Sequence, residues 1–177
     1  MRTKFLPYGA HDINDDDIDE VVKVLKSDWI VQGKKVEEFE KAVSQFTGVK
    51  HCIAVTSGTA ALDIAFQSLN LPEGSEVITT PYTFAATSNC ILYHNCKSVF
   101  ADIDPKTYNI NPEEVRKKIT DKTKAIIGVD FAGQPCDWDE LRKIADEHKL
   151  FLIEDAAHSF GATYCGKNAG TLADIAI

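Results

Sequence analysis

Short apolar runs alternate with longer amphipathic runs from His51 to the last residue of this chain. The short runs are typical of buried strands, and the longer ones show apolar residues at helical spacing. Strands that alternate with helices of this length require crossover connections, which join parallel strands and place helices on both faces of one sheet. The sequence therefore predicts an α/β fold, a three-layer sandwich around a mainly parallel sheet.

Ten elements are expected in this region. Strands are predicted at 51–56, 76–80, 98–102, 125–130, 151–155 and within 172–177, and helices at 58–69, 84–94, 112–119 and 137–148. Two amphipathic helices precede them, one starting at Asp15 to Asp17 and one ending at Gly48. We expect residues 1–50 to form an amino-terminal helical segment and 51–177 an α/β large domain that is incomplete. The sequence stops at Ile177 inside an expected strand, which favours an amino-terminal fragment.

Charge and composition exclude several classes of function. The net charge is −8, which disfavours binding to nucleic acid and to anionic membrane surfaces. The five cysteines form no C-x-x-C pair, so zinc and redox motifs are absent and reduced thiols are expected. Neither a signal peptide nor an apolar run long enough to cross a bilayer is found. We expect a soluble, cytoplasmic protein.

The strand predicted at 151–155 carries two acidic residues at its carboxyl end, and His158 follows. Ligands of open α/β sheets bind outside the carboxyl ends of the strands. A carboxylate there can keep a heteroaromatic nitrogen protonated, as a pyridoxal phosphate (PLP) site requires, and Asp155 is our candidate. The alternative is that Asp155 only caps the next helix. A metal site of Glu154, Asp155 and His158 is disfavoured because no further histidine stands at ligand spacing.

A second candidate site is Ser57-Gly58-Thr59, where a predicted strand passes into a helix. Free amides at a helix start, together with the positive end of the helix dipole and two hydroxyls, form a phosphate cradle. Ser57 or Thr59 could equally be an ordinary helix cap.

Other strand ends carry residues with two possible roles. Tyr82 or Phe84 could stack on a flat cofactor, although an aromatic residue after a strand more often belongs to the core. Asp130 could be a ligand group, but a turn-forming role is favoured. Asp102-Ile103-Asp104 matches the D-x-D element of nucleotide-sugar transferases, and the proline that follows favours a turn instead.

Taken together, these motifs resemble the DegT-type (DegT/DnrJ/StrS) nucleotide-sugar aminotransferases, which are fold-type I PLP-dependent transferases. The resemblance spans essentially the whole chain, and its order and spacing are specific. It rests on an amino-terminal segment with a tyrosine, the bend from Trp29 to Gly33, Ser57-Gly58-Thr59, Pro81-x-x-Phe84-x-Ala86-Thr87, Asp130-Phe131-Ala132-Gly133, and Glu154-Asp155-Ala156-Ala157-His158.

The resemblance implies a role for each matching residue. Asp155 and His158 would be the catalytic residues present, with Asp155 on the cofactor's ring nitrogen and His158 near its phenolic oxygen. Phe84 would stack on the ring, and Ser57, Gly58 and Thr59 would bind the phosphate. The nucleotide-sugar would contact Tyr8, Asp28, Trp29, Ile30, Val31 and Gly58, although Val31 replaces the hydroxyl residue common in relatives. No metal is expected.

The resemblance also implies an activity. Val129 to Cys136 looks most like the branch that forms UDP-4-amino-4,6-dideoxy-N-acetyl-β-L-altrosamine on the route to pseudaminic acid. The reaction would be transamination of UDP-4-keto-6-deoxy-N-acetylhexosamine with an amino acid donor such as glutamate, in a homodimer. By family spacing the Schiff-base lysine would lie just past Ile177, so the fragment alone would be inactive. Two alternatives stay open: a PLP-dependent sugar dehydratase of the same family, and a non-catalytic module that binds cofactor or nucleotide.

Overall fold

The computed structural model describes Phe5, Gly9 and residues 11–177 of the chain. The described residues form two compact units, one that ends at Phe39 and one that spans Glu40–Ile177. Among the described residues, no helix has the length and apolar character needed to cross a membrane.

The first unit contains α1 (Asp15–Leu25) and the start of α2 (Lys34–Thr47), as the sequence predicts. A capping box fixes the start of α1: the Asn14 side chain accepts hydrogen bonds from the amides of Asp16 and Asp17, and the Asp17 carboxylate accepts one from the Asn14 amide at 3.0 Å. Lys35 and Glu20 form an exposed ion pair of 2.9 Å between the two helices. None of the α1 residues is buried.

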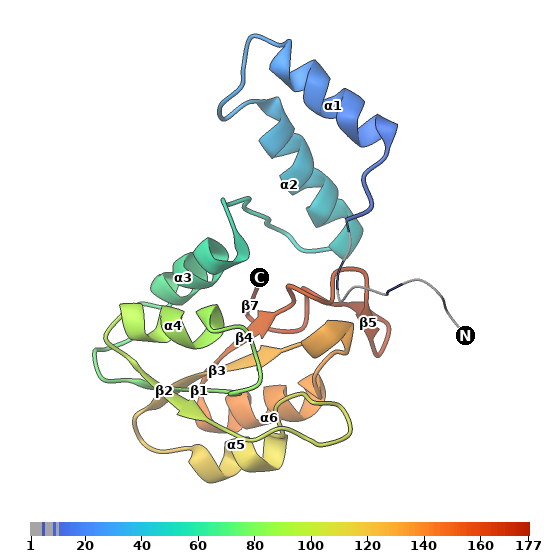
Figure 1. The fold of residues 1–177 in the computed structure, drawn as a ribbon. Coiled ribbons are helices and arrows are strands. Elements are labelled where there is room, and N and C mark those ends of the chain that lie inside the picture. The colour runs from blue at the N-terminus through green and yellow to red at the C-terminus, as the bar shows by residue number, and fades with distance from the viewer. Residues whose placement is uncertain (1–4, 6–8, 10) are drawn as a thin grey trace. The chain divides into compact units, whose positions relative to one another are not determined.

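The second unit is built on a five-stranded sheet in which every neighbouring pair is parallel (Figure 1). The strand order is β2-β1-β3-β4-β7. The strands are β1 (Glu76–Thr79), β2 (Lys97–Phe100), β3 (Thr123–Val129), β4 (Phe151–Asp155) and β7 (Ile175–Ala176). The predicted α/β fold with a mainly parallel sheet is confirmed, and so are five of the six predicted strands.

Helices cover both faces of this sheet (Figure 1). The covering helices are α3 (Gly58–Ser68) and α4 (Ala86–Tyr93) on one face, and α5 (Pro112–Lys118) and α6 (Trp138–His148) on the other. The chain moves outward from β1 to β2 and then returns past β1 to β3. Because crossover connections between parallel strands are right-handed, this reversal of direction places the later helices on the opposite face of the sheet. The three-layer sandwich is therefore confirmed.

Side chains of β4 alternate between the two cores. Leu152 belongs to the core under α5 and α6, whereas Ile153 belongs to the core under α3 and α4. The same alternation separates the next two residues, so Glu154 points to the α5–α6 face and Asp155 to the α3–α4 face. Gly128 of β3 serves the packing on the first of these faces, because a Cβ there would lie 2.8 Å from the Trp138 ring.

The prediction of a strand at 51–56 is wrong, because the structure describes these residues and shows no strand there. These residues have no strand partner, and Ile53 and Val55 are exposed. The Ala54 amide instead donates to the Glu40 carboxylate at 2.8 Å. An apolar run is typical of a buried strand, but a strand also needs the backbone of a neighbour, which the run does not identify.

A small hairpin, absent from the sequence prediction, follows β4. It consists of β5 (Thr163–Tyr164) and β6 (Lys167–Asn168), joined by Cys165 and Gly166, which both have positive φ as a two-residue primed turn requires. The Asn168 side chain donates to the carbonyls of Phe46 and Thr47, each at 3.1 Å. The last turn of α2 is thereby tied to the α/β unit, and the boundary between the two units falls inside α2.

Candidate functional site

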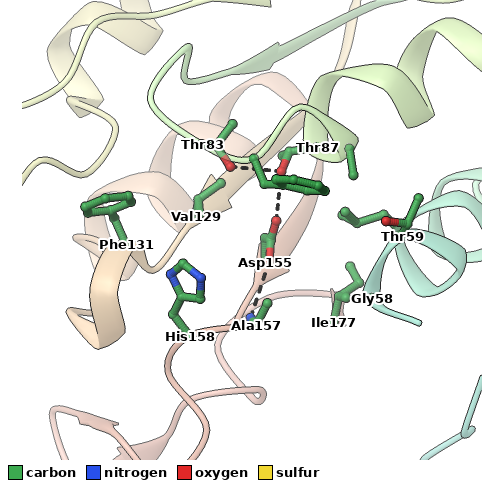
Figure 2. A pocket seen from close by; sticks show the side chains of 13 residues that line it. Gly58, Thr59, Thr83, Thr87, Val129, Phe131, Asp155, Ala157, His158 and Ile177 are labelled. Carbon is green, nitrogen blue, oxygen red and sulfur yellow. Dashed lines mark hydrogen bonds between the residues drawn. The ribbon is translucent and has the colours of Figure 1, made fainter. Parts of the chain in front are cut away.

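A cavity of about 250 Å³ opens at the carboxyl ends of β1, β3 and β4 (Figure 2). The strand order reverses between β1 and β3, so this edge is the switch point at which open α/β sheets bind ligands. Residues from five segments line the cavity: Gly58, Thr59, Leu62, Thr83, Phe84, Ala86, Thr87, Val129, Phe131, Asp155, Ala157, His158 and Ile177.

Asp155 lies at the centre of the cavity wall and is only 6% exposed. Its Oδ2 accepts a hydrogen bond from the Thr87 hydroxyl at 2.9 Å, and its Oδ1 accepts only a long one, 3.4 Å, from the Ala157 amide. Burial raises the pKa of Asp155, and the Thr87 hydrogen bond opposes that increase. A buried carboxylate with spare acceptor capacity toward a cavity suits a cationic N–H group of a ligand.

His158 lies on the other side of the cavity from Gly58 and Thr59 in Figure 2. Its Nδ1 accepts a hydrogen bond from the Ala132 amide at 3.3 Å, which leaves Nε2 to carry the proton of the neutral ring. Ala132 has φ of 53°, an unusual conformation for alanine, and Gly133 has φ of 88°. A Cβ at Gly133 would also lie 3.1 Å from the His158 carbonyl oxygen. The short 3₁₀ turn η1 (Phe131–Gly133) therefore fits closely against His158.

The start of α3 supplies the opposite wall of the cavity. Gly58 and Thr59 line it, and the amides in the first turn of a helix have no acceptor within the helix. Ser57 is the N-cap, and its Oγ accepts from the Ala60 amide at 3.1 Å. The cap role weighed for Ser57 is thus present in the structure. Ser57 does not belong to the cavity lining, while Gly58 and Thr59 present the amide donors and positive helix end that an anion requires.

An aromatic ring and a small residue complete the cavity. Phe84 lines it, and the residue is 75% exposed, so its ring is accessible to a ligand. Ala157 lines it from the segment after β4. Tyr82 is not one of the lining residues; its ring packs against that of Phe131, with ring centroids 4.5 Å apart and the ring planes inclined by 48°. Of the two aromatic candidates, the structure therefore places Phe84 at the cavity.

The other acidic candidates serve the fold. Asp130 is fully buried and accepts hydrogen bonds from the Cys136 amide, the Trp138 indole and the Ser159 hydroxyl. Asp104 accepts from the amides of Lys106 and Thr107, as the predicted turn requires.

Glu154 faces the opposite side of the sheet from Asp155. Its carboxylate accepts from the Gly170 and Leu172 amides at 2.6 and 2.9 Å. Within the described residues, no cluster of three histidine, cysteine or acidic side chains is suited to hold a metal ion.

Of the predicted sugar contacts, Gly58 lines the cavity described above, and the others lie in the first unit or outside the described residues. Asp28, Trp29 and Ile30 line a broad cavity within residues 20–38, and Val31 beside them is 76% exposed. Tyr8 lies outside the described residues. The predicted role of these residues toward a nucleotide-sugar stays a prediction.

Thr83 and Thr87 are cavity residues to which the sequence analysis gave no role. Both follow β1: Thr87 lies in the first turn of α4, Thr83 lies in the loop before that helix, and their hydroxyl oxygens are 2.9 Å apart. Their link to Asp155 crosses 68 positions of sequence, which local patterns do not reveal.

Known proteins share the sequence pattern of this chain. Residues 11–177 match the family model described as the DegT/DnrJ/EryC1/StrS aminotransferase family. The chain belongs to this family. Aminotransferases of this family are PLP-dependent, as predicted, and their structures have the α/β fold found in this chain.

Two curated relatives illustrate the range of the family. The spore coat polysaccharide biosynthesis protein SpsC of Bacillus subtilis is 43% identical, over 98% of this chain and 44% of its own length. GDP-perosamine synthase of Caulobacter vibrioides is 41% identical, over 89% of this chain and 43% of its own length. The chain thus spans less than half the length of these relatives.

Solved structures show the same correspondence. Helicobacter pylori PseC, an aminotransferase involved in the biosynthesis of pseudoaminic acid, superposes with a TM-score of 0.92 at 34% identity, covering 96% of this chain and 46% of PseC. Spr1654 of Streptococcus pneumoniae, solved in PLP and PMP forms, gives a TM-score of 0.92 at 31% identity, covering 97% of this chain and 47% of Spr1654.

Proposed function

We propose that this chain is the cofactor-binding part of a PLP-dependent nucleotide-sugar aminotransferase. The observation that carries the proposal is one cavity that joins the start of α3, the buried carboxylate of Asp155 and the imidazole of His158. These groups match the three polar ends of PLP, namely its phosphate, its ring nitrogen and its phenolic oxygen.

Each residue has a defined task in this proposal. The amides of Gly58 and Thr59 bind the phosphate, Ser57 holds the helix start in place, and Phe84 covers one ring face. Asp155 keeps the ring nitrogen protonated, and His158 Nε2 donates to the phenolic oxygen. When bound, PLP supplies an electron sink for a carbanion next to its imine carbon.

The substrate class follows from the relatives and is also a proposal. We propose that the amino group passes from an amino acid, such as glutamate, to the 4-keto carbon of a nucleotide-linked 6-deoxy sugar. The likeness to PseC supports UDP-4-keto-6-deoxy-N-acetylhexosamine, and that to GDP-perosamine synthase supports a nucleotide-sugar more generally. Asp28 to Val31 and Tyr8 would contact the nucleotide-sugar, and the working form would be a homodimer.

The matched relatives are more than twice as long as the matched region, and we propose that the Schiff-base lysine lies in the rest of the whole protein. Borohydride reduction of that protein with PLP, followed by peptide mass spectrometry, tests this. A phosphopyridoxyl label on a lysine is expected. A label on none, with PLP bound, would favour the dehydratase alternative.

The activity is tested with the whole protein, PLP, ¹⁵N-glutamate and the UDP-4-keto sugar, followed by mass spectrometry of the sugar product. Incorporation of ¹⁵N supports the proposal, whereas loss of a hydroxyl without nitrogen supports a dehydratase. PLP binding without turnover would support a binding module, and failure to bind PLP would overturn the whole proposal. Asp155→Asn can be compared with Asp104→Asn, which makes the same change in an exposed turn.

A further inference from the structure

Two threonine hydroxyls and the Asp155 carboxylate form a chain of hydrogen bonds in the cavity wall (Figure 2). Thr83 Oγ1 lies 2.9 Å from Thr87 Oγ1, and Thr87 Oγ1 lies 2.9 Å from Asp155 Oδ2. Thr87 is fully buried, and Thr83 lines the cavity.

The number of available protons fixes which group donates in each of these two hydrogen bonds. An ionised carboxylate only accepts hydrogen bonds, and a threonine hydroxyl has one proton. Thr87 therefore donates to Asp155, and Thr83 must donate to Thr87. The direction holds as long as Asp155 is ionised, which is the state that a protonated ring nitrogen needs.

We propose that Thr87, supported by Thr83, is the positioning residue that fixes the carboxylate of Asp155 for the ring nitrogen of the cofactor. This inference rests on the proposed function. It is carried by the Thr87 hydroxyl, which makes the shorter of the two hydrogen bonds to the Asp155 carboxylate, 2.9 Å compared with 3.4 Å from the Ala157 amide. By occupying Oδ2, Thr87 fixes the rotation of the carboxylate and leaves Oδ1, with its single long hydrogen bond, as the freer oxygen.

A merely structural role is the competing explanation, since the same hydrogen bond joins α4 to β4. The two roles differ in one respect. A positioning role acts through the ring nitrogen, so it vanishes when the ligand has no such nitrogen, whereas a structural role affects every ligand of the cavity equally.

The test uses the whole protein, freed of cofactor, and measures equilibrium binding of PLP and of its analogue with carbon in place of the ring nitrogen. Thr87→Val keeps the side-chain size and removes the donor, and Thr87→Ser keeps the donor. We expect Thr87→Val to weaken PLP binding about 10- to 100-fold, the effect of one hydrogen bond to a charged group, and to leave analogue binding unchanged. Thr87→Ser should restore PLP binding to within a few-fold.

Two further variants sharpen the test. Thr83→Val should have the same selectivity but a smaller effect than Thr87→Val, because it acts one hydroxyl further away. Ser88→Ala, in the same helix and outside the cavity lining, should bind both ligands like the wild type. Thermal unfolding of the cofactor-free proteins checks that each variant is folded.

The outcomes separate this inference from the function on which it rests. Equal weakening for PLP and analogue in Thr87→Val, or no weakening at all, would overturn the positioning role while the function stands. A wild-type protein that binds no PLP, or binds PLP and analogue equally, would overturn the role of Asp155 itself.

Discussion

Asp130 and Asp155 stand at the carboxyl ends of neighbouring strands, and both are buried, yet their surroundings differ. Asp130 accepts three hydrogen bonds of 2.8 to 3.0 Å, from its own loop, from the first residue of α6 and from the segment after β4. Asp155 accepts one short bond and one long bond, and it faces a cavity. Position in the sheet therefore does not distinguish a structural from a functional carboxylate. The number of its hydrogen bonds within the protein does.

The contrast between Asp130 and Asp155 is tested most directly by the variant Asp155→Ala in the whole protein. We expect turnover to fall by about two orders of magnitude or more, because electrostatic groups at the reacting centre contribute on this scale. The free energy of unfolding should stay close to that of the wild type, since the variant removes a buried charge with few partners. Kinetics and urea unfolding measure both quantities, and near-normal turnover would refute the assignment.

Asp130→Ala should give the opposite result. It leaves a buried amide, the Trp138 indole N–H and a hydroxyl without their acceptor, so we expect a loss of about 3–5 kcal/mol in stability. Urea unfolding is the measurement. If Asp130→Ala unfolds at the wild-type urea midpoint, the number of hydrogen bonds to a carboxylate does not indicate whether it stabilises the fold.

Glu154, on the other face of the sheet, is a third buried carboxyl group, and its effect on stability depends on pH. Burial raises the pKa of Glu154 from an ordinary 4.5 to about 7, and nearby Asp130 adds to the increase. The folded state thus holds this proton more tightly than the unfolded state. The stability from Glu154 is present at low pH and is lost as pH rises from about 4.5 to about 7, with a total loss on the order of 3 kcal/mol.

Glu154→Gln removes this titration and should flatten the dependence of stability on pH across the same window. Urea unfolding of both proteins at pH 5 and pH 8 gives the difference between the two slopes. The raised pKa of Asp155 acts in the same direction in both proteins and cancels. Identical slopes would contradict the prediction.

The smallest expected effect is that of Ser159→Ala, which removes one of the three donors to Asp130. We expect a loss of about 1–2 kcal/mol in stability, because the two remaining donors still hold the carboxylate. PLP binding should not change, in contrast to Thr87→Val. A loss of PLP affinity in Ser159→Ala would show that the two carboxylates do not act separately.

Much of the fold could be predicted because its main elements depend on local patterns. The strand at 151–155 and the helices capped by Asn14, Ser57 and Asp137 follow from apolar periodicity and residues that favour helix starts. The unpaired segment 51–56 could not be foreseen, because pairing depends on distant backbone. The turn at Ala132 was hidden as well, since alanine gives no signal for a positive φ.

The candidate site was predictable to the extent that it lies at strand ends. Gly58, Thr59, Phe84, Asp155 and His158 do line one cavity. The sequence favours a turn role for Asp130 and the cofactor role for Asp155, but it does not reveal the hydrogen-bond partners that distinguish them, because these come from elsewhere in the chain. Thr87 was missed for the same reason.

The alternation of β4 also limits how the chain can change over evolution. Neighbouring acidic residues at its end face two different compartments, so the loss or gain of a single residue within the strand would exchange them. The carboxylate of Asp155 would then face the amides of Gly170 and Leu172, and the carboxylate of Glu154 would face the cavity. Point mutations can adjust this edge of the sheet one property at a time, whereas a length change in β4 would disable binding and folding together.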